Sequence, residues 1–74
     1  MQDYPNRSGS SGVRAFEIGP DFIIVRFADG GTYLYNHERP GWAKVERMKL
    51  LAKQGRGLAT YINREAYDYA KKLG

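Results

Sequence analysis

The 74-residue chain has no cysteine, a single histidine and no apolar run longer than four residues. The absence of cysteine excludes disulfides, thiolate zinc sites and cysteine nucleophiles. A four-residue apolar run is too short to cross a bilayer, which takes about 20 residues. The length suits one small domain. The polar N-terminal residues predict no secretory signal, and a cysteine-free chain suits a reducing compartment, so we expect a cytoplasmic protein.

The chain also contains few groups that suit catalysis or metal binding. His37 has no recognisable triad partner and is expected to be a surface or capping residue. The carboxylates show no metal-ligand spacing, and no serine lies in a nucleophile-type turn. We therefore expect no enzymatic activity, no cofactor and no metal, and the sequence favours a binding module.

A change of composition divides the chain into two parts. Residues 1–10 are mostly polar. They contain too few apolar groups to offset the entropy cost of ordering, which predicts a flexible N-terminal tail. Residues 11–74 are expected to form a single β-β-β-α-α domain.

The first half of that domain is typical of a β-meander. The segments 13–18, 22–27 and 32–35 contain the β-branched and aromatic residues that favour strands. Gly19-Pro20-Asp21 separates the first two segments, and Asp29-Gly30 predicts a two-residue type I′ turn between the last two. Three antiparallel strands are therefore expected.

The second half has helical periodicity. A helix is expected over Trp42–Lys53, and Gly55 is expected to end it as a left-handed C-cap. The residues expected on its core side are Trp42, Val45, Met48 and Ala52. A second helix is expected over Leu58–Leu73. The sequence therefore predicts an α+β fold, with both helices packed on one face of a three-stranded meander.

The predicted turn also sets a register for the second hairpin. With a two-residue loop, Arg26 lies opposite Tyr33 and Ile24 lies opposite Tyr35. Because side chains alternate along a strand, Arg26 and both tyrosines then lie on one face of the sheet. If the other, apolar face packs under the helices, the face with Arg26 and the tyrosines stays open and can stack unpaired bases. In the alternative arrangement the tyrosines pack against the helices with their hydroxyls at the rim. The sequence leaves both arrangements open.

Positive charge is concentrated in the helical half, where residues 37–74 contain nine basic and four acidic side chains. Such an excess suits phosphate contacts, although basic side chains also simply solvate a helix surface. The glycine-rich 54–57 loop suits a phosphate or serves only to separate two helices. The candidate nucleic-acid-binding residues are Arg26, Tyr33, Tyr35, Lys49, Lys53, Arg56 and Arg64.

Five segments form a series in the order of the chain. They are Ser11-Gly12-Val13, Phe16-Glu17-Ile18-Gly19, Phe27 to Gly31, Tyr33-Leu34-Tyr35 and Gly57 to Arg64. The series resembles the KTSC domain, a short domain found at the C-terminus of some lysyl-tRNA synthetases and in stand-alone bacterial and phage proteins. The resemblance covers roughly residues 11–73, and the attachment of the domain to a tRNA synthetase implies RNA binding.

The sequence thus predicts a non-enzymatic module that binds RNA or single-stranded nucleic acid through an aromatic and basic sheet face and the basic helical half. The alternative is a protein-interaction module, such as a small bacterial or phage accessory protein that docks on a host protein. No membrane association is expected, and the protein is expected to be a monomer or a weak homodimer.

Overall fold

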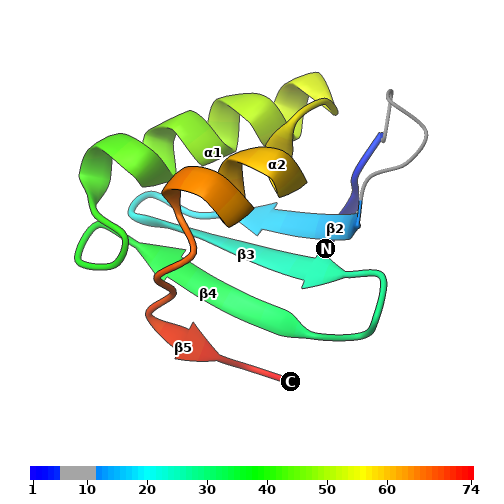
Figure 1. Ribbon diagram of the computed structural model, residues 1–74, viewed down its shortest axis with the longest axis horizontal. Coiled ribbons are helices and arrows are strands. Elements are labelled where there is room, and N and C mark those ends of the chain that lie inside the picture. Colours follow the sequence, from blue (N-terminus) through cyan, green and yellow to red (C-terminus); the bar gives the residue numbers. More distant parts are fainter. Residues whose placement is uncertain (6–11) are drawn as a thin grey trace.

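The computed structural model describes residues 1–5 and 12–74, which form an α+β fold (Figure 1). Within these residues, one antiparallel sheet has the strand order β1-β2-β3-β4-β5. Its strands are β1 (Gln2–Asp3), β2 (Val13–Ile18), β3 (Phe22–Phe27), β4 (Thr32–Asn36) and β5 (Lys71–Lys72). The helices α1 (Trp42–Gln54) and α2 (Leu58–Glu65) cover one face of the sheet. The predicted class and the central meander are confirmed, and two short edge strands extend the sheet.

The core lies between the helices and the sheet. Phe16, Ile23 and Val25 from β2 and β3 meet Val45 and Met48 from α1, and each of these side chains is at most 1% exposed. The period of two along the strands and of 3.6 along the helix brings them into one layer. Among residues 1–5 and 12–74, no helix covers the opposite face of the sheet (Figure 1).

The β3–β4 hairpin has a longer loop than the sequence predicted. The Phe27 amide donates to the Gly31 carbonyl at 2.8 Å, and the Gly30 amide donates to the Phe27 carbonyl at 2.9 Å. The loop therefore contains Ala28, Asp29 and Gly30. Gly30 has a φ of 95°, the left-handed conformation that the last residue of a three-residue hairpin loop requires. The predicted two-residue turn is wrong by one residue.

The extra loop residue turns the side chains of β4 to the other face of the sheet. Tyr33 pairs with Val25 and Tyr35 pairs with Ile23, so both tyrosines lie on the helix-covered face. Tyr35 is 2% exposed. Arg26 follows Val25 in the strand and points to the opposite face. The predicted grouping of Arg26 with two tyrosines on an open face is therefore wrong, and the tyrosines pack on the helix side.

The helix α1 begins at Trp42, as predicted, and ends at Gln54, one residue beyond the predicted Lys53. Gly55 caps it with a φ of 71° in the left-handed region, as predicted. Trp42, however, is 65% exposed rather than part of the core. Helical side chains lean toward the N-terminus, so the side chain of the first helical residue extends past the helix end.

The second predicted helix, Leu58–Leu73, is twice as long as the eight-residue α2. α2 ends at Glu65, and the chain then returns to the sheet as β5. The Ala70 amide donates to the Leu34 carbonyl at 2.8 Å, and the Leu73 amide donates to the Thr32 carbonyl at 2.7 Å. The free edge of β4 supplies these partners, and its pairing outweighs the helical periodicity of the sequence.

The start of the chain is part of the fold. Gln2 and Asp3 pair with β2, and Tyr4 is 6% exposed with its ring edge-on to Phe16 at a centroid distance of 6.4 Å. The Tyr4 hydroxyl accepts a hydrogen bond from the Leu58 amide, one of the free donors at the start of α2. The flexible tail predicted for residues 1–10 thus does not describe residues 2–4, and residues 6–10 lie outside the described part of the chain.

Substitution of Tyr4 tests whether the first strand stabilises the fold. Tyr4→Ala is expected to lower the free energy of unfolding by about 3 kcal/mol, because it empties a buried aromatic position. Tyr4→Phe is expected to cost about 1 kcal/mol, because it removes only the hydrogen bond to Leu58. Urea denaturation measures both, with the exposed Gln2→Ala as control. Equal stability of Tyr4→Ala and the wild type would contradict this role.

Candidate functional site

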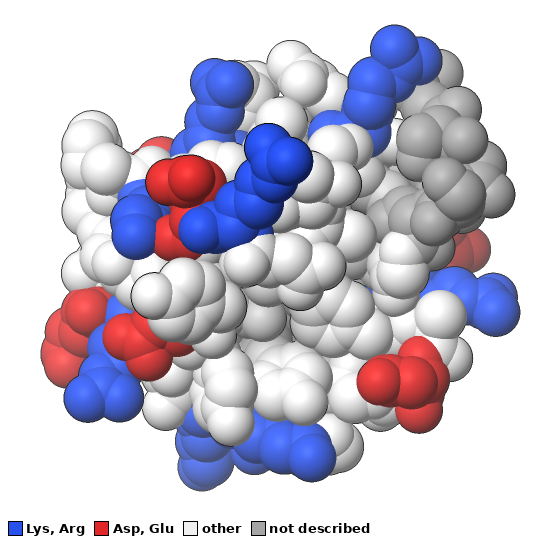
Figure 2. Space-filling model, viewed as in Figure 1, with Lys and Arg blue, Asp and Glu red and all other residues white. Residues whose placement is uncertain are grey.

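A cleft lined mainly by aromatic side chains lies between β4, α2 and the segment that leads to β5. Its volume is about 260 Å³. The residues that line this tyrosine cleft are Phe27, Asp29, Tyr33, Tyr35, Ile62, Asn63, Tyr67 and Tyr69. Figure 2 shows uncharged surface in the middle of this face of the molecule, with charged side chains of both signs around it.

Three of the rings are in contact with one another. The Tyr33 and Tyr69 centroids are 4.7 Å apart with the planes tilted by 56°, and Phe27 meets Tyr33 edge-on at 5.7 Å. Tyr67 is 74% exposed and Tyr69 is 41% exposed. Phe27 and Tyr33 are partly buried, and exposed rings that line a cleft with partly buried ones give a planar ligand a surface on which to stack.

Tyr35 lines the cleft although it is almost fully buried in the core. Its burial, together with the nearby phenol groups of Tyr33 and Tyr69, raises the pKa of Tyr35 to about 12. The hydroxyl is therefore uncharged at neutral pH. An uncharged phenol both donates and accepts hydrogen bonds, so Tyr35 adds polar character to an aromatic site.

Charged groups of both signs border the cleft. The Lys72 ammonium lies 5.9 Å from the centroid of the Tyr33 ring, within cation–π distance. Asp29 lines the cleft, and one of its carboxylate oxygens accepts a hydrogen bond from the Gly31 amide. The cleft thus combines exposed aromatic rings with an adjacent cation, a combination that suits a base and its phosphate.

Lys49, one of the predicted binding residues, is occupied within the fold. It is 8% exposed, and its ammonium donates to the Pro20 carbonyl at 3.0 Å and to the Glu46 carboxylate at 2.8 Å. Glu46 also contacts the His37 ring at 2.9 Å. Lys49 therefore connects α1 to the turn between β2 and β3, and its ammonium does not reach the surface that the sequence predicted.

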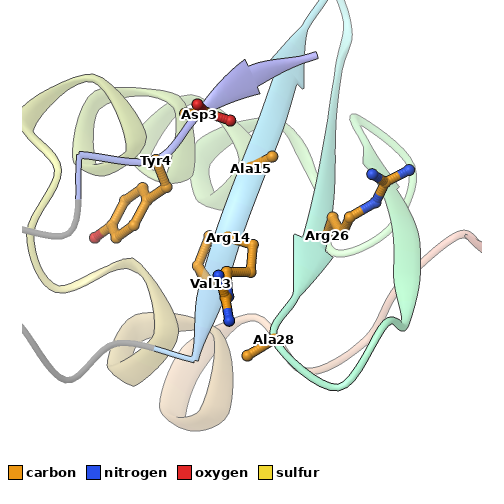
Figure 3. A pocket seen from close by; sticks show the side chains of 7 residues that line it. All are labelled: Asp3, Tyr4, Val13, Arg14, Ala15, Arg26 and Ala28. Atoms are coloured by element: carbon orange, nitrogen blue, oxygen red, sulfur yellow. The ribbon is translucent and has the colours of Figure 1, made fainter.

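The predicted site residues do not form one site. Tyr33 and Tyr35 line the cleft, whereas Arg26 lies on the opposite face of the sheet beside a shallow hollow of about 570 Å³ (Figure 3). The hollow is lined by Asp3, Tyr4, Val13, Arg14, Ala15, Arg26 and Ala28. Figure 3 shows the guanidinium groups of Arg14 and Arg26 pointing away from each other, so they do not converge on a common anion.

The remaining predicted cations, Lys53, Arg56 and Arg64, are exposed and do not line the cleft. Sequence reasoning missed Tyr67 and Tyr69 as site residues, because it placed both in a continuous helix. The three residues Tyr67-Asp68-Tyr69 are too few to establish a period of two, so the local sequence contains no clear signal that the helix ends before them.

The stability of the protein at acid pH tests the contacts of Glu46. Its hydrogen bonds to Lys49 and His37 lower the pKa of Glu46 below its ordinary value of 4.5. The stability that the carboxylate contributes is therefore complete above pH 4.5 and is lost as the pH falls through the lowered pKa. Glu46→Gln is expected to be less stable than the wild type at pH 7. It is also expected to lose less stability than the wild type between pH 5 and pH 2, with stability measured as the urea midpoint. The exposed Glu38→Gln is the control, and an unchanged acid profile for Glu46→Gln would contradict the contacts.

The stability of the protein at alkaline pH tests the burial of Tyr35. The pKa of Tyr35 is about 12 in the folded protein and 10 in the unfolded chain, so between these values the folded state holds the extra proton. Stability is therefore complete below pH 10 and falls by about 2 to 3 kcal/mol as the pH rises toward 12. Tyr35→Phe is expected to lose less stability over this range, with Tyr61→Phe, outside the cleft, as control. Equal slopes for the wild type and Tyr35→Phe would contradict the burial of an uncharged phenol.

No protein-family model matches the chain, and no curated protein and no solved structure matches it either. No helix in the described part of the chain is long and apolar enough to cross a membrane. Residues 1–5 and 12–74 contain no group of three or more His, Cys, Asp or Glu side chains placed to hold a metal ion.

Proposed function

We propose that the protein is a non-enzymatic module that binds RNA or another single-stranded nucleic acid, and that an unpaired base stacks in the tyrosine cleft. One observation carries this proposal: the exposed rings of Tyr67 and Tyr69 line the same cleft, where Tyr69 contacts Tyr33 and the Lys72 ammonium lies 5.9 Å from the centroid of the Tyr33 ring. Every base has an aromatic face, so stacking on such rings does not depend on sequence.

The size of the cleft favours one planar ring. At about 260 Å³, it is smaller than the pockets that enclose drug-sized ligands, which start near 300 Å³. It lies at the surface between α2 and the path to β5, so a base enters it while its sugar and phosphate stay outside. The Lys72 ammonium, 5.9 Å from the centroid of the Tyr33 ring, then lies close to the base and its phosphate.

The charge of the chain supports the same ligand. The net charge is +4, and the excess lies in residues 37–74, which form both helices and β5. Neutralising phosphates releases counterions, so such an excess strengthens binding at low salt. The resemblance to the KTSC domain, and through it to a tRNA synthetase extension, also favours RNA.

A protein-interaction module is the second candidate, and Trp42 favours it. This residue is 65% exposed at the start of α1 and does not line the tyrosine cleft. Exposed tryptophans are common among the side chains that carry most of the binding energy at protein interfaces. The two candidates therefore depend on different aromatic residues, which makes them separable by substitution.

Fluorescence anisotropy with a labelled 12-nucleotide oligouridine at low salt tests the proposal. Tyr67→Ala and Tyr69→Ala are each expected to weaken binding by about 5- to 150-fold, since base stacking contributes about 1–3 kcal/mol. Trp42→Ala is the matched control, because it removes an exposed aromatic ring outside the cleft, with an exposure between those of Tyr67 and Tyr69, and is expected to leave RNA affinity unchanged.

The result that would contradict the proposal is a wild-type protein that binds neither RNA nor single-stranded DNA at low salt. Binding that the tyrosine substitutions leave unchanged would contradict the cleft as the site. If nucleic acid does not bind, the exposed Trp42 becomes the residue to substitute in assays of protein partners.

A further inference from the structure

A second hollow lies on the other side of α2 from the tyrosine cleft, between α2 and α1. Its volume is about 450 Å³, and we call it the inter-helix groove. It is lined by Arg47, Leu51, Gly57, Thr60, Tyr61, Arg64 and Glu65. Ile62 and Asn63 line the cleft instead, and with 3.6 residues per turn the two sets occupy opposite sides of α2.

Two arginines from different helices border this groove. Arg47 belongs to α1 and Arg64 to α2, and both are exposed. The ion pairs within residues 1–5 and 12–74 join His37 to Glu46, Arg39 to Asp68 and Lys49 to Glu46, so neither groove arginine is in one. Both guanidinium groups therefore keep their donors for a ligand, unlike the occupied ammonium of Lys49.

The floor of the groove suits a nucleotide strand. Leu51 and Tyr61 are partly exposed there and give it an apolar surface, and Thr60 also lines it. Two positive side chains face one negative side chain, Glu65, so the lining favours an anion. Guanidinium groups bind phosphate oxygens through pairs of parallel hydrogen bonds.

We propose that the inter-helix groove is a phosphate subsite for the same strand whose base enters the tyrosine cleft. This inference rests on the proposed nucleic-acid binding. The strand crosses α2 between the two hollows, with Asn63 on the cleft side and Arg64 on the groove side. A helix with its side chains is about 10–12 Å across, a distance that a few nucleotides span. A strand must therefore be long enough to reach from the cleft to the groove residues if it is to bind with full affinity.

The Arg47→Gln/Arg64→Gln double variant tests the subsite. Its matched control is Lys44→Gln/Lys71→Gln, which also removes two exposed charges from residues 37–74, at positions that line neither the groove nor the cleft. Anisotropy with 12-nucleotide oligouridine is measured from low to moderate salt. The groove variant is expected to bind at least tenfold more weakly than the control variant. Its slope of log affinity against log salt is expected to be about 1.4 shallower than that of the wild type, about 0.7 for each lost phosphate contact on a single strand.

Equal losses in the two double variants would overturn the subsite, because charge alone would then explain them. The proposed function would still stand in that case if Tyr67→Ala weakens binding. A wild-type protein that binds no oligouridine would overturn both. Unchanged thermal unfolding of both variants shows that any loss arises at the surface and not from the fold.

Discussion

The hydrogen bond from the Phe27 amide to the Gly31 carbonyl sets the register on which the candidate site depends. It closes a three-residue loop, and this loop length decides which face of the sheet each side chain of β4 occupies. With this register, Tyr35 enters the core and Tyr33 lies beside Phe27 on the helix side. With a loop one residue shorter, Leu34 would lie on the helix-covered face of the sheet in place of Tyr33 and Tyr35. No aromatic cleft would then exist beside α2.

The pairing of β5 with β4 completes the cleft that this register begins. After α2 the chain returns to the free edge of β4, and this path brings Tyr69 against the Tyr33 ring, Lys72 near that ring and Tyr67 into the lining of the cleft. On the other side of the molecule, the contacts of Lys49 with Pro20 and Glu46 hold α1 against the β2–β3 turn. The backbone ladder thus positions the aromatic rings, while a buried cation positions a helix.

Much of the fold could be predicted from local signals, and the failures have physical causes. β-Branched strands, the helical period of α1 and the left-handed Gly55 are local features, and all appear in the structure. The Asp29-Gly30 pair occurs in hairpin loops of two and of three residues, so the pair alone does not fix the register. Lys49 and Tyr4 depend on partners far along the chain, 29 and 54 residues away. The cleft forms only because of the β3–β4 register and the return of the chain to β5, and neither could be predicted. The sequence therefore indicated Tyr33 and Tyr35 as site residues but neither of the exposed tyrosines, Tyr67 and Tyr69.

An ¹H–¹⁵N NMR titration with single-stranded RNA at low salt tests most directly whether the tyrosine cleft is the binding surface. The described fold predicts the largest amide shifts at Tyr33, Tyr67, Tyr69 and Lys72, with further shifts at Arg47 and Arg64 as the strand lengthens. The open face of the sheet, where Arg26 lies, is predicted to remain unchanged. Shifts concentrated on that face with an unperturbed cleft would contradict this account, as would a titration in which no amide moves.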